Sequence, residues 1–138
     1  MFCITLPDQI DRLEELSQAV AAFSESAGIP DETLFQLNLV VEELFVNFVS
    51  HGLSRNGQFK LSIECNDCDL RLTLKDNGQP FNPLEAAVPD THAPLQDRNE
   101  GQLGLHLVRQ IASAISYERS SGCNVVRMTI PNSTAASQ

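Results

Sequence analysis

The chain has 138 residues, a length typical of one domain whose core is large enough to fold without disulfides or a structural metal. The net charge of −9 argues against direct nucleic-acid binding, which normally needs a basic surface. No apolar run approaches the ~20 residues of a membrane-spanning helix, and residues 1–7 lack a signal-peptide pattern. We therefore expect a cytoplasmic protein that binds neither nucleic acid nor membrane.

The first predicted elements are a short strand and a helix. Residues 2–6 are β-prone, and Pro7 ends the strand that they predict. Asp8 follows at the position of a helix N-cap, and Gly28 marks the end of that helix. The apolar residues between them recur every three or four positions, which predicts an amphipathic helix: Ile10, Leu13, Leu16, Val20 and Phe23.

A second helix and a pair of strands come next. Asp31 can cap a helix that runs to about residue 51, and Gly52 ends it. Two runs with alternating apolar and polar side chains, residues 57–66 and 69–75, predict strands joined by a tight turn.

Two cysteines flank this turn. Cys65 and Cys68 form a CxxC pair, which can be half of a zinc site. A tetrahedral site needs two more ligands, and Cys3 and Cys123 would have to converge on it from both ends of the chain. We favour the interpretation that the pair flanks a hairpin turn in a reducing compartment.

Residues 76–100 hold four prolines and no clear periodicity, and long loops of this kind inside a compact domain are often functional lids. A third helix is predicted over residues 105–115. Residues 115–119 and 124–130 predict a closing pair of strands. A polar tail, residues 132–138, is expected to be frayed.

This order of elements predicts an α/β (α+β) fold with a single domain over residues 1–131. Strands that mostly follow one another as hairpins imply a mixed, mostly antiparallel sheet. Three helices would cover one of its faces, which gives a two-layer sandwich.

The second helix carries polar residues that need an explanation. Glu43, Asn47 and His51 are spaced four apart and therefore stack on one stripe, while the helix is apolar nearly all round. A buried carboxylate costs several kcal/mol unless it is paired or ligates something. An amide oxygen on Asn47 suits Mg²⁺, and Glu43 would be a base one turn away. The alternative is that both side chains face solvent from a half-exposed helix.

Two further motifs are weak when taken singly. Asp76 follows a strand, where a carboxylate can accept a hydrogen bond from an exocyclic amine such as that of adenine, and Gly78 permits close backbone approach. Asp-Asn-Gly is also a common turn signal. Gly101 and Gly104 precede the third predicted helix, where free backbone N–H groups can face phosphate. The order and spacing of all three motifs is far more specific than any one of them.

This combination resembles the GHKL (histidine-kinase-like) ATPase superfamily, and within it the anti-sigma-factor serine-protein kinases. The N box matches residues 40–52, the G1 box residues 76–83 and the G2 box residues 101–108. Residues 115–125 resemble the C-terminal hairpin of that family. The resemblance covers nearly the whole chain and implies the GHKL ATPase (Bergerat) fold.

The resemblance also implies roles for individual residues. Asn47 would coordinate Mg²⁺, and Glu43 would be the general base that accepts the proton of a protein serine or threonine hydroxyl. Asp76 would bind the adenine amine of ATP, with Gly78 shaping that end of the pocket. Backbone contacts to the phosphates are implied for four residues: Gly101, Leu103, Gly104 and Leu105. Two weaker candidates are His51, lining the pocket, and Arg98, reaching the γ-phosphate.

The activity implied by the resemblance is that of an ATP-dependent serine/threonine-protein kinase and anti-sigma factor. It would act by partner switching, phosphorylating a STAS-type anti-sigma-factor antagonist and sequestering a sigma factor, and homodimers are common in the family. Pro80 and Gln102 stand where glycines are common. They motivate the alternative of an ATP/ADP-binding module that regulates a partner by binding only. A sensor-kinase catalytic domain is less favoured, because all three histidines lie within the ATP-binding region: His51, His92 and His106.

Overall fold

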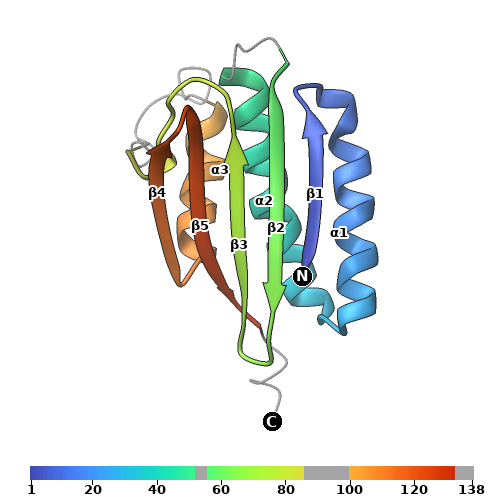
Figure 1. Cartoon of the computed structure of the whole chain (residues 1–138). Helices are drawn as coiled ribbons and strands as arrows, with labels where there is room; N and C mark the ends of the chain where they lie inside the picture. Colours follow the sequence, from blue (N-terminus) through green and yellow to red (C-terminus); the bar gives the residue numbers. More distant parts are fainter. Residues whose placement is uncertain (52–55, 86–99, 133–138) are drawn as a thin grey trace.

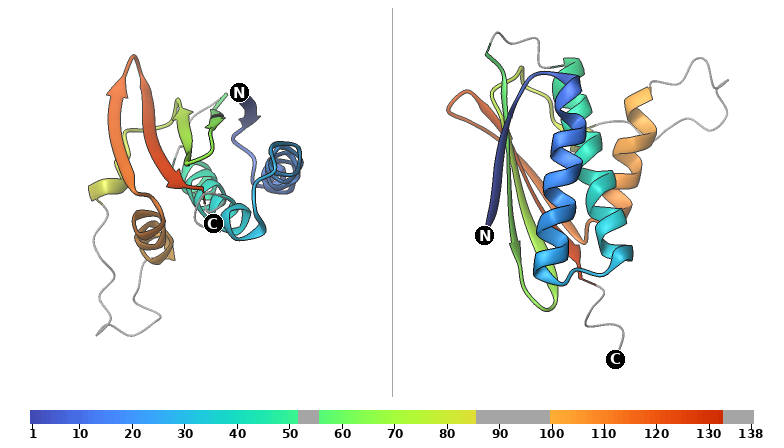
Figure 2. Two further views of the ribbon diagram at one scale, coloured as in Figure 1. Left: turned by 90° about the horizontal axis from the view of Figure 1, so that it is seen from below. Right: turned by 90° about the vertical axis from the view of Figure 1, so that its right-hand side faces the viewer.

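The structure is a computed structural model that describes residues 1–51, 56–85 and 100–132. Within these ranges, five strands form one sheet in the spatial order β1-β2-β3-β5-β4, and three α-helices lie together on one of its faces (Figure 1, Figure 2). The elements are β1 (Phe2–Pro7), α1 (Leu13–Ala27), α2 (Asp31–His51), β2 (Gln58–Cys65), β3 (Asp69–Asp76), α3 (Glu100–Ile111), β4 (Ala114–Ser120) and β5 (Cys123–Pro131). The predicted two-layer α+β sandwich is confirmed.

The sheet is antiparallel at every pair of neighbouring strands, so the expectation of a mixed sheet was wrong. Helices α1 and α2 follow β1 and return the chain to β2, which runs in the opposite direction to β1 (Figure 1). The single helix α3 leaves β4 running in the same direction as β3, but β5 lies between those two strands. β3 and β4 are therefore parallel but not adjacent, and β5, which lies between them, is antiparallel to both.

The core lies between the sheet and the helices because each strand alternates apolar and polar side chains. Leu61 and Ile63 of β2 and Leu72 of β3 are essentially inaccessible to solvent. Phe45 of α2 packs edge-to-face on Phe59 of β2, with ring centroids 5.3 Å apart. None of the helices in the described ranges is both long and apolar enough to cross a bilayer.

The first helix begins differently from the prediction. A short 3₁₀ helix, Ile10–Arg12, precedes α1, and its N-cap is Gln9, without a side-chain cap bond. Asp8 is therefore not the predicted N-cap. Its backbone N–H instead donates to the carbonyl of Gly57 at 3.0 Å, which ties the end of β1 to the entry of β2. Gly28 ends α1 as expected, in the left-handed conformation with φ 72°.

The third helix begins and ends earlier than predicted. It spans Glu100–Ile111 rather than residues 105–115. The chain leaves the helix here because Ser113 donates its backbone N–H to Thr129 at 2.9 Å, and Ala114 then pairs with the same residue of β5. Pairing to the sheet thus overrides the helical periodicity of the last residues. The predicted lid falls mostly on residues 86–99, which lie outside the described residues.

The C-terminal residue that the structure describes is fixed to the domain. Asn132, which we expected at the start of a frayed tail, is buried. Its backbone N–H donates to the carbonyl of Cys68 at 2.9 Å, and its Nδ2 donates to that of Asn66 at 3.2 Å. These bonds fasten the end of β5 to the β2–β3 turn. Residues 133–138 lie outside the described part.

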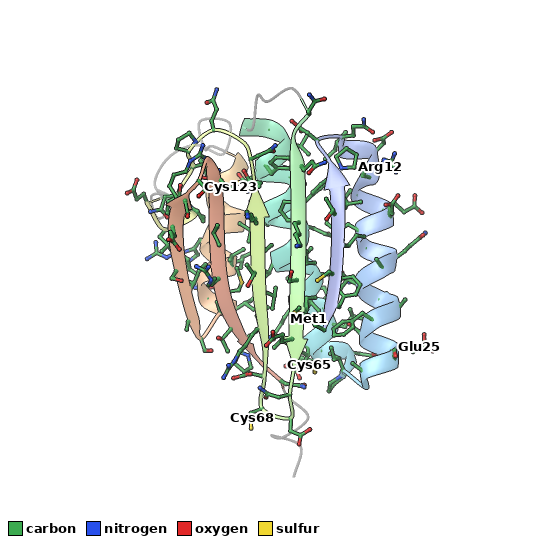
Figure 3. The ribbon with its side chains drawn as sticks, in the orientation of Figure 1. Met1, Arg12, Glu25, Cys65, Cys68 and Cys123 are labelled. Carbon is green, nitrogen blue, oxygen red and sulfur yellow. The ribbon has the colours of Figure 1, made fainter. Side chains whose placement is uncertain are left out.

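The cysteine pair belongs to this turn. Cys65 ends β2 and Cys68 lies at the tip of the hairpin, far from Cys123 at the opposite end of the sheet (Figure 3). Burial, together with the nearby carboxylates of Asp67 and Asp69, raises the pKa of the Cys65 thiol. Among the described residues, no cluster of three or more His, Cys, Asp or Glu side chains could hold a metal ion. Cys65 and Cys68 flank the β2–β3 turn, as the sequence predicted.

Candidate functional site

A hollow between the helical layer and one end of the sheet brings together polar residues from three elements. Its empty space is about 450 Å³, part of it open to solvent. Asn47 comes from α2, Asp76 from the end of β3 and Asn124 from the start of β5. The remaining lining residues are mostly apolar: Leu44, Phe48, Phe59, Leu74, Gln79, Phe81, Pro83 and Val126. An apolar hollow with a few convergent polar groups is the common form of a small-molecule site.

Asp76 is the most unusual ionisable group of the hollow. Its Oδ1 accepts hydrogen bonds from the backbone N–H of Gly78 at 2.9 Å and from Nδ2 of Asn124 at 3.0 Å. Burial raises the pKa of Asp76, although these two bonds and the positive charge of Arg119 counteract part of that effect. The other oxygen, Oδ2, has no donor among the described residues. Asp76 can therefore accept a further hydrogen bond from a ligand.

Asn124 is a site residue that the sequence analysis missed. It lies opposite Asp76 in the register of β3 and β5 and is only 3% exposed. Its Nδ2 also donates to the carbonyl of Gln79 at 2.7 Å, and its Oδ1 accepts from the N–H of Phe81 at 3.2 Å. The one available signal was alternation, because Asn124 is the polar member of an otherwise apolar inward-facing series in β5.

The loop after β3 is held from a second direction. Arg119 of β4 donates from Nη1 to the carbonyl of Gly78 at 2.8 Å. Together with the Asn124 bonds, this contact fastens the turn that follows Asp76 to the β4–β5 hairpin. Pro80 lies within this turn. A glycine there would make the backbone more flexible, whereas Pro80 and the contacts of Arg119 and Asn124 restrict it.

Glu43 and Asn47 of α2 contact each other, and Glu43 faces Gly104 of α3. Asn47 is 5% exposed, and its Nδ2 donates to the carbonyl of Glu43 at 2.7 Å and to Oε1 of Glu43 at 2.9 Å. In this orientation, Oδ1 of Asn47 has no donor among the described residues. A neutral amide oxygen at the wall of a hollow is an appropriate ligand for Mg²⁺.

Gly104 allows α3 to approach Glu43 closely. A Cβ atom on residue 104 would overlap the carboxyl group of Glu43. Any larger residue at this position would therefore push Glu43 out of the place where it contacts Asn47. The glycine was predicted as part of a phosphate-binding loop, whereas its role in the structure is close helix–helix contact.

The early start of α3 also changes the expected phosphate contacts. In an α-helix only the first four backbone N–H groups lack an intrahelical acceptor. Gly101 is in that group, because the helix begins at Glu100. Leu103, Gly104 and Leu105 are not, and Leu105 is a core residue with 3% exposure. Backbone contacts to phosphate from these three residues do not fit a helix that begins at Glu100.

Two predicted site residues cannot be placed. His51 is the last residue of α2, but its side chain lies outside the described part. Arg98 lies outside the described residues altogether. Gly78 contributes through its backbone, which donates to Asp76 and accepts from Arg119.

Comparison with protein families identifies a match over almost the whole chain. A family model described as the histidine kinase-like ATPase domain matches residues 6–130. This range covers every described strand and α-helix except part of β1 and the last residue of β5.

Two of the relatives are named as serine- or serine/threonine-protein kinases. The serine/threonine-protein kinase BtrW of Bordetella bronchiseptica is 31% identical over 97 residues, which are 69% of this chain and 68% of that protein. The serine-protein kinase RsbW of Halalkalibacterium halodurans is 25% identical over 130 residues, 91% of this chain and 80% of that protein. Both alignments extend over most of each partner, so the likeness concerns whole domains.

Solved structures support the fold. The crystal structure of the RsbU and RsbW domains of a Mycobacterium tuberculosis protein aligns with a TM-score of 0.64 and 12% identity, over 94% of this chain and 32% of that one. The catalytic domain of the histidine kinase ThkA aligns with a TM-score of 0.54 and 17% identity, over 96% and 98% of the two chains. At these identities the comparison concerns the architecture alone.

Replacement of Asp76 by Asn should stabilise the unliganded protein at neutral pH. Because the folded-state pKa is raised, ionisation of Asp76 costs stability as pH rises from the unfolded value through the folded value. The cost is complete above the folded pKa and disappears as pH falls. Asn cannot ionise but can still accept both hydrogen bonds through Oδ1. We expect a higher melting temperature for Asp76→Asn at pH 7 and a shrinking difference on acidification, measured by circular dichroism.

The matched control for this prediction is Asp67→Asn, which removes the same charge from an exposed turn. Its effect on the melting temperature should be small at both ends of the pH range. A melting temperature of Asp76→Asn below that of the wild type at pH 7 would show that burial of this carboxylate is not the dominant effect.

The contact between Gly104 and Glu43 can be measured as a coupling energy. Gly to Ala within a helix normally stabilises by about 1 kcal/mol. In the wild type we expect Gly104→Ala to lose this gain because the new methyl group displaces the Glu43 carboxyl. In a Glu43→Ala background the gain should reappear, with a coupling of roughly 1 kcal/mol or more. Urea unfolding of the four proteins provides the cycle, and equal effects of Gly104→Ala in both backgrounds would contradict the predicted contact.

Proposed function

The chain belongs to the histidine kinase-like ATPase domain family, and we propose that it is an ATP-dependent serine/threonine-protein kinase. The observation that carries the proposal is the arrangement of Asn47 and Asp76 on one hollow, with Glu43 hydrogen-bonded to Asn47. Two of its relatives, BtrW and RsbW, are named as serine/threonine- or serine-protein kinases, which supports this reaction class.

In this proposal, the β3 end of the hollow binds the purine base. Oδ2 of Asp76 accepts a hydrogen bond from the exocyclic amine of adenine. No donor among the described residues competes for this oxygen. Apolar side chains that line the hollow, including Phe81 and Val126, contact the faces of the base. The half-buried carboxylate then gains a further hydrogen-bond donor, which offsets the desolvation that raises the pKa of Asp76.

Asn47 holds Mg²⁺ through its amide oxygen. The fit rests on the orientation of the side chain, since both Nδ2 contacts are to Glu43 and Oδ1 is left for a ligand. Mg²⁺ takes few ligands from protein and most from phosphates and water, and Asn47 would contribute one oxygen to that set. When bound, the ion neutralises charge on the phosphate groups.

Glu43 is the general base. Its Oε1 accepts from Asn47, and Oε2 has no hydrogen-bond donor among the described residues. Oε2 takes the proton of a serine or threonine hydroxyl as the hydroxyl oxygen bonds to the γ-phosphorus and the bond from that phosphorus to ADP breaks. Phosphoryl transfer depends mainly on positioning and charge neutralisation, and proton removal by one base contributes about 10²–10⁴-fold.

The protein partners follow from the kinases that the chain is similar to. We place the acceptor hydroxyl on a STAS-type anti-sigma-factor antagonist and assign a sigma factor as the alternative partner, so that phosphorylation switches between the two. A homodimer is the form in which we expect the protein to act. The names of the relatives support the kinase reaction, and the switching model extends it.

One observation favours a second candidate, an ATP- or ADP-binding module without transfer activity. The turn after β3 is fastened by Arg119 and Asn124 and contains Pro80, so this side of the hollow has little freedom to rearrange. A site that binds nucleotide without closing around it would regulate a partner by binding alone.

A single-turnover assay with radiolabelled ATP and a STAS-type antagonist from the same organism tests the kinase proposal. We expect Glu43→Gln to slow transfer by about 100-fold or more. The variant should still bind Mg-ATP, whose presence at ~100 times its Kd stabilises a protein by about 2.7 kcal/mol. The matched control is Glu42→Gln, because Glu42 is the adjacent carboxylate but accepts a hydrogen bond from Ser17 of α1, away from the site.

Transfer by Glu43→Gln at the wild-type rate would contradict the assignment of the base. Thermal stabilisation by Mg-ATP without any transfer by the wild type would select the binding-only module. The absence of both transfer and stabilisation would overturn the nucleotide site itself.

A further inference from the structure

The hydroxyl of Tyr117 makes the shortest hydrogen bond in the network around the hollow. Tyr117 lies in β4, the edge strand, and its ring packs against the hydrophobic core. Its Oη donates to Oδ1 of Asn124 across the β4–β5 hairpin at 2.6 Å. Tyr117 does not line the hollow, so any influence on a ligand must pass through Asn124.

The Asn124 amide has one correct orientation, and Tyr117 helps to hold the amide in it. With Nδ2 toward β3, the amide donates to Oδ1 of Asp76 and to the carbonyl of Gln79. Turned by half a rotation, it would place its oxygen against these two acceptors and lose both bonds. The backbone N–H of Phe81 can only donate, so it penalises the turned state from the other side, and the short bond from Tyr117 holds the amide in place.

The orientation of Asn124 fixes the carboxylate of Asp76. Asn124 and the N–H of Gly78 both bind Oδ1, which leaves Oδ2 as the oxygen available to a ligand. The same bond lowers the pKa of Asp76 against the effect of burial, as does the positive charge of Arg119, while Asp8 raises it. Loss of the Asn124 bond would therefore leave the carboxylate less well oriented and would raise the pKa of Asp76 further.

We propose that Tyr117 is a positioning residue for recognition of the exocyclic amine of the purine. Its hydroxyl orients Asn124, Asn124 orients Asp76, and Asp76 binds the amine. This inference rests on the proposed nucleotide site and adds to it a residue that positions the groups that recognise the base. Because Tyr117 acts through Asn124 and Asp76, its effect is confined to the part of the ligand that Asp76 contacts.

Because the expected effect of Tyr117 is limited to the exocyclic amine, comparing two nucleotides that differ in this amine distinguishes a positioning role from a purely structural one. Isothermal titration measures the Kd of Mg-ATP and of Mg-purine riboside 5′-triphosphate, which lacks the exocyclic amine. We expect the wild type to prefer ATP by roughly tenfold, and Tyr117→Phe to reduce this preference by about three- to tenfold, the range of one hydrogen bond. The loss should appear on ATP, with the affinity for the other nucleotide changed by less than about twofold.

A second variant and a control sharpen the test. Asn124→Asp is isosteric but presents an oxygen to Asp76, and we expect it to abolish the preference for ATP. Ser116→Ala removes a hydroxyl from the adjacent residue of β4, which is exposed on the opposite face of the sheet, and should keep the wild-type preference. Circular dichroism verifies that each variant is folded.

The outcomes separate the inference from the function on which it rests. A wild type that binds ATP no better than the analogue would overturn adenine recognition by Asp76 and the inference with it. A wild-type preference that survives intact in Tyr117→Phe would overturn the positioning role and leave the nucleotide site in place. Equal weakening of both nucleotides by Tyr117→Phe would reduce Tyr117 to a structural residue.

Discussion

The hydrogen bond between the Asp76 carboxylate and the Asn124 amide joins the end of β3 to the start of β5 and organises this end of the molecule. Asp76 is half-buried, and partial burial of a carboxylate is costly, but it is tolerated here because Asn124 and the N–H of Gly78 both donate to it. The antiparallel register that pairs Asp76 with Asn124 makes the contact possible. The same asparagine also holds the following turn, so the shape of the hollow depends on this pair.

The opposite wall of the hollow obeys a steric constraint. Glu43 and Asn47 lie one turn apart on α2, and Gly104 lets α3 pass so close that the Glu43 carboxyl occupies the space of a missing side chain. α3 thereby confines the carboxylate beside Asn47. The two walls complement each other, because the sheet presents a fixed acceptor for a base and the helices present an oxygen for a cation and a proton acceptor.

The sequence predicted the elements that depend on local periodicity and missed the features that depend on tertiary contact. The bounds of α2 and the β2–β3 hairpin follow from apolar spacing and turn residues, and the structure agrees with both. The start of α3 at Glu100 was missed because the glycines indicated a loop, whereas Gly104 serves helix packing. Asn124 was missed because its importance comes from the residue opposite it in the sheet. The roles assigned to Glu43, Asn47 and Asp76 remain predictions that the geometry supports.

The central claim is that nucleotide and cation bind together in this hollow, with the cation at Asn47. Mn²⁺ in place of Mg²⁺ tests it directly, because the paramagnetic ion broadens NMR signals of nearby groups only. On addition of Mn-ATP, we predict that the side-chain amide signals of Asn47 disappear. Those of Asn132, which lies beside the turn at the other end of the sheet, should persist. Survival of the Asn47 signals at an intensity equal to that of Asn132 would contradict the account.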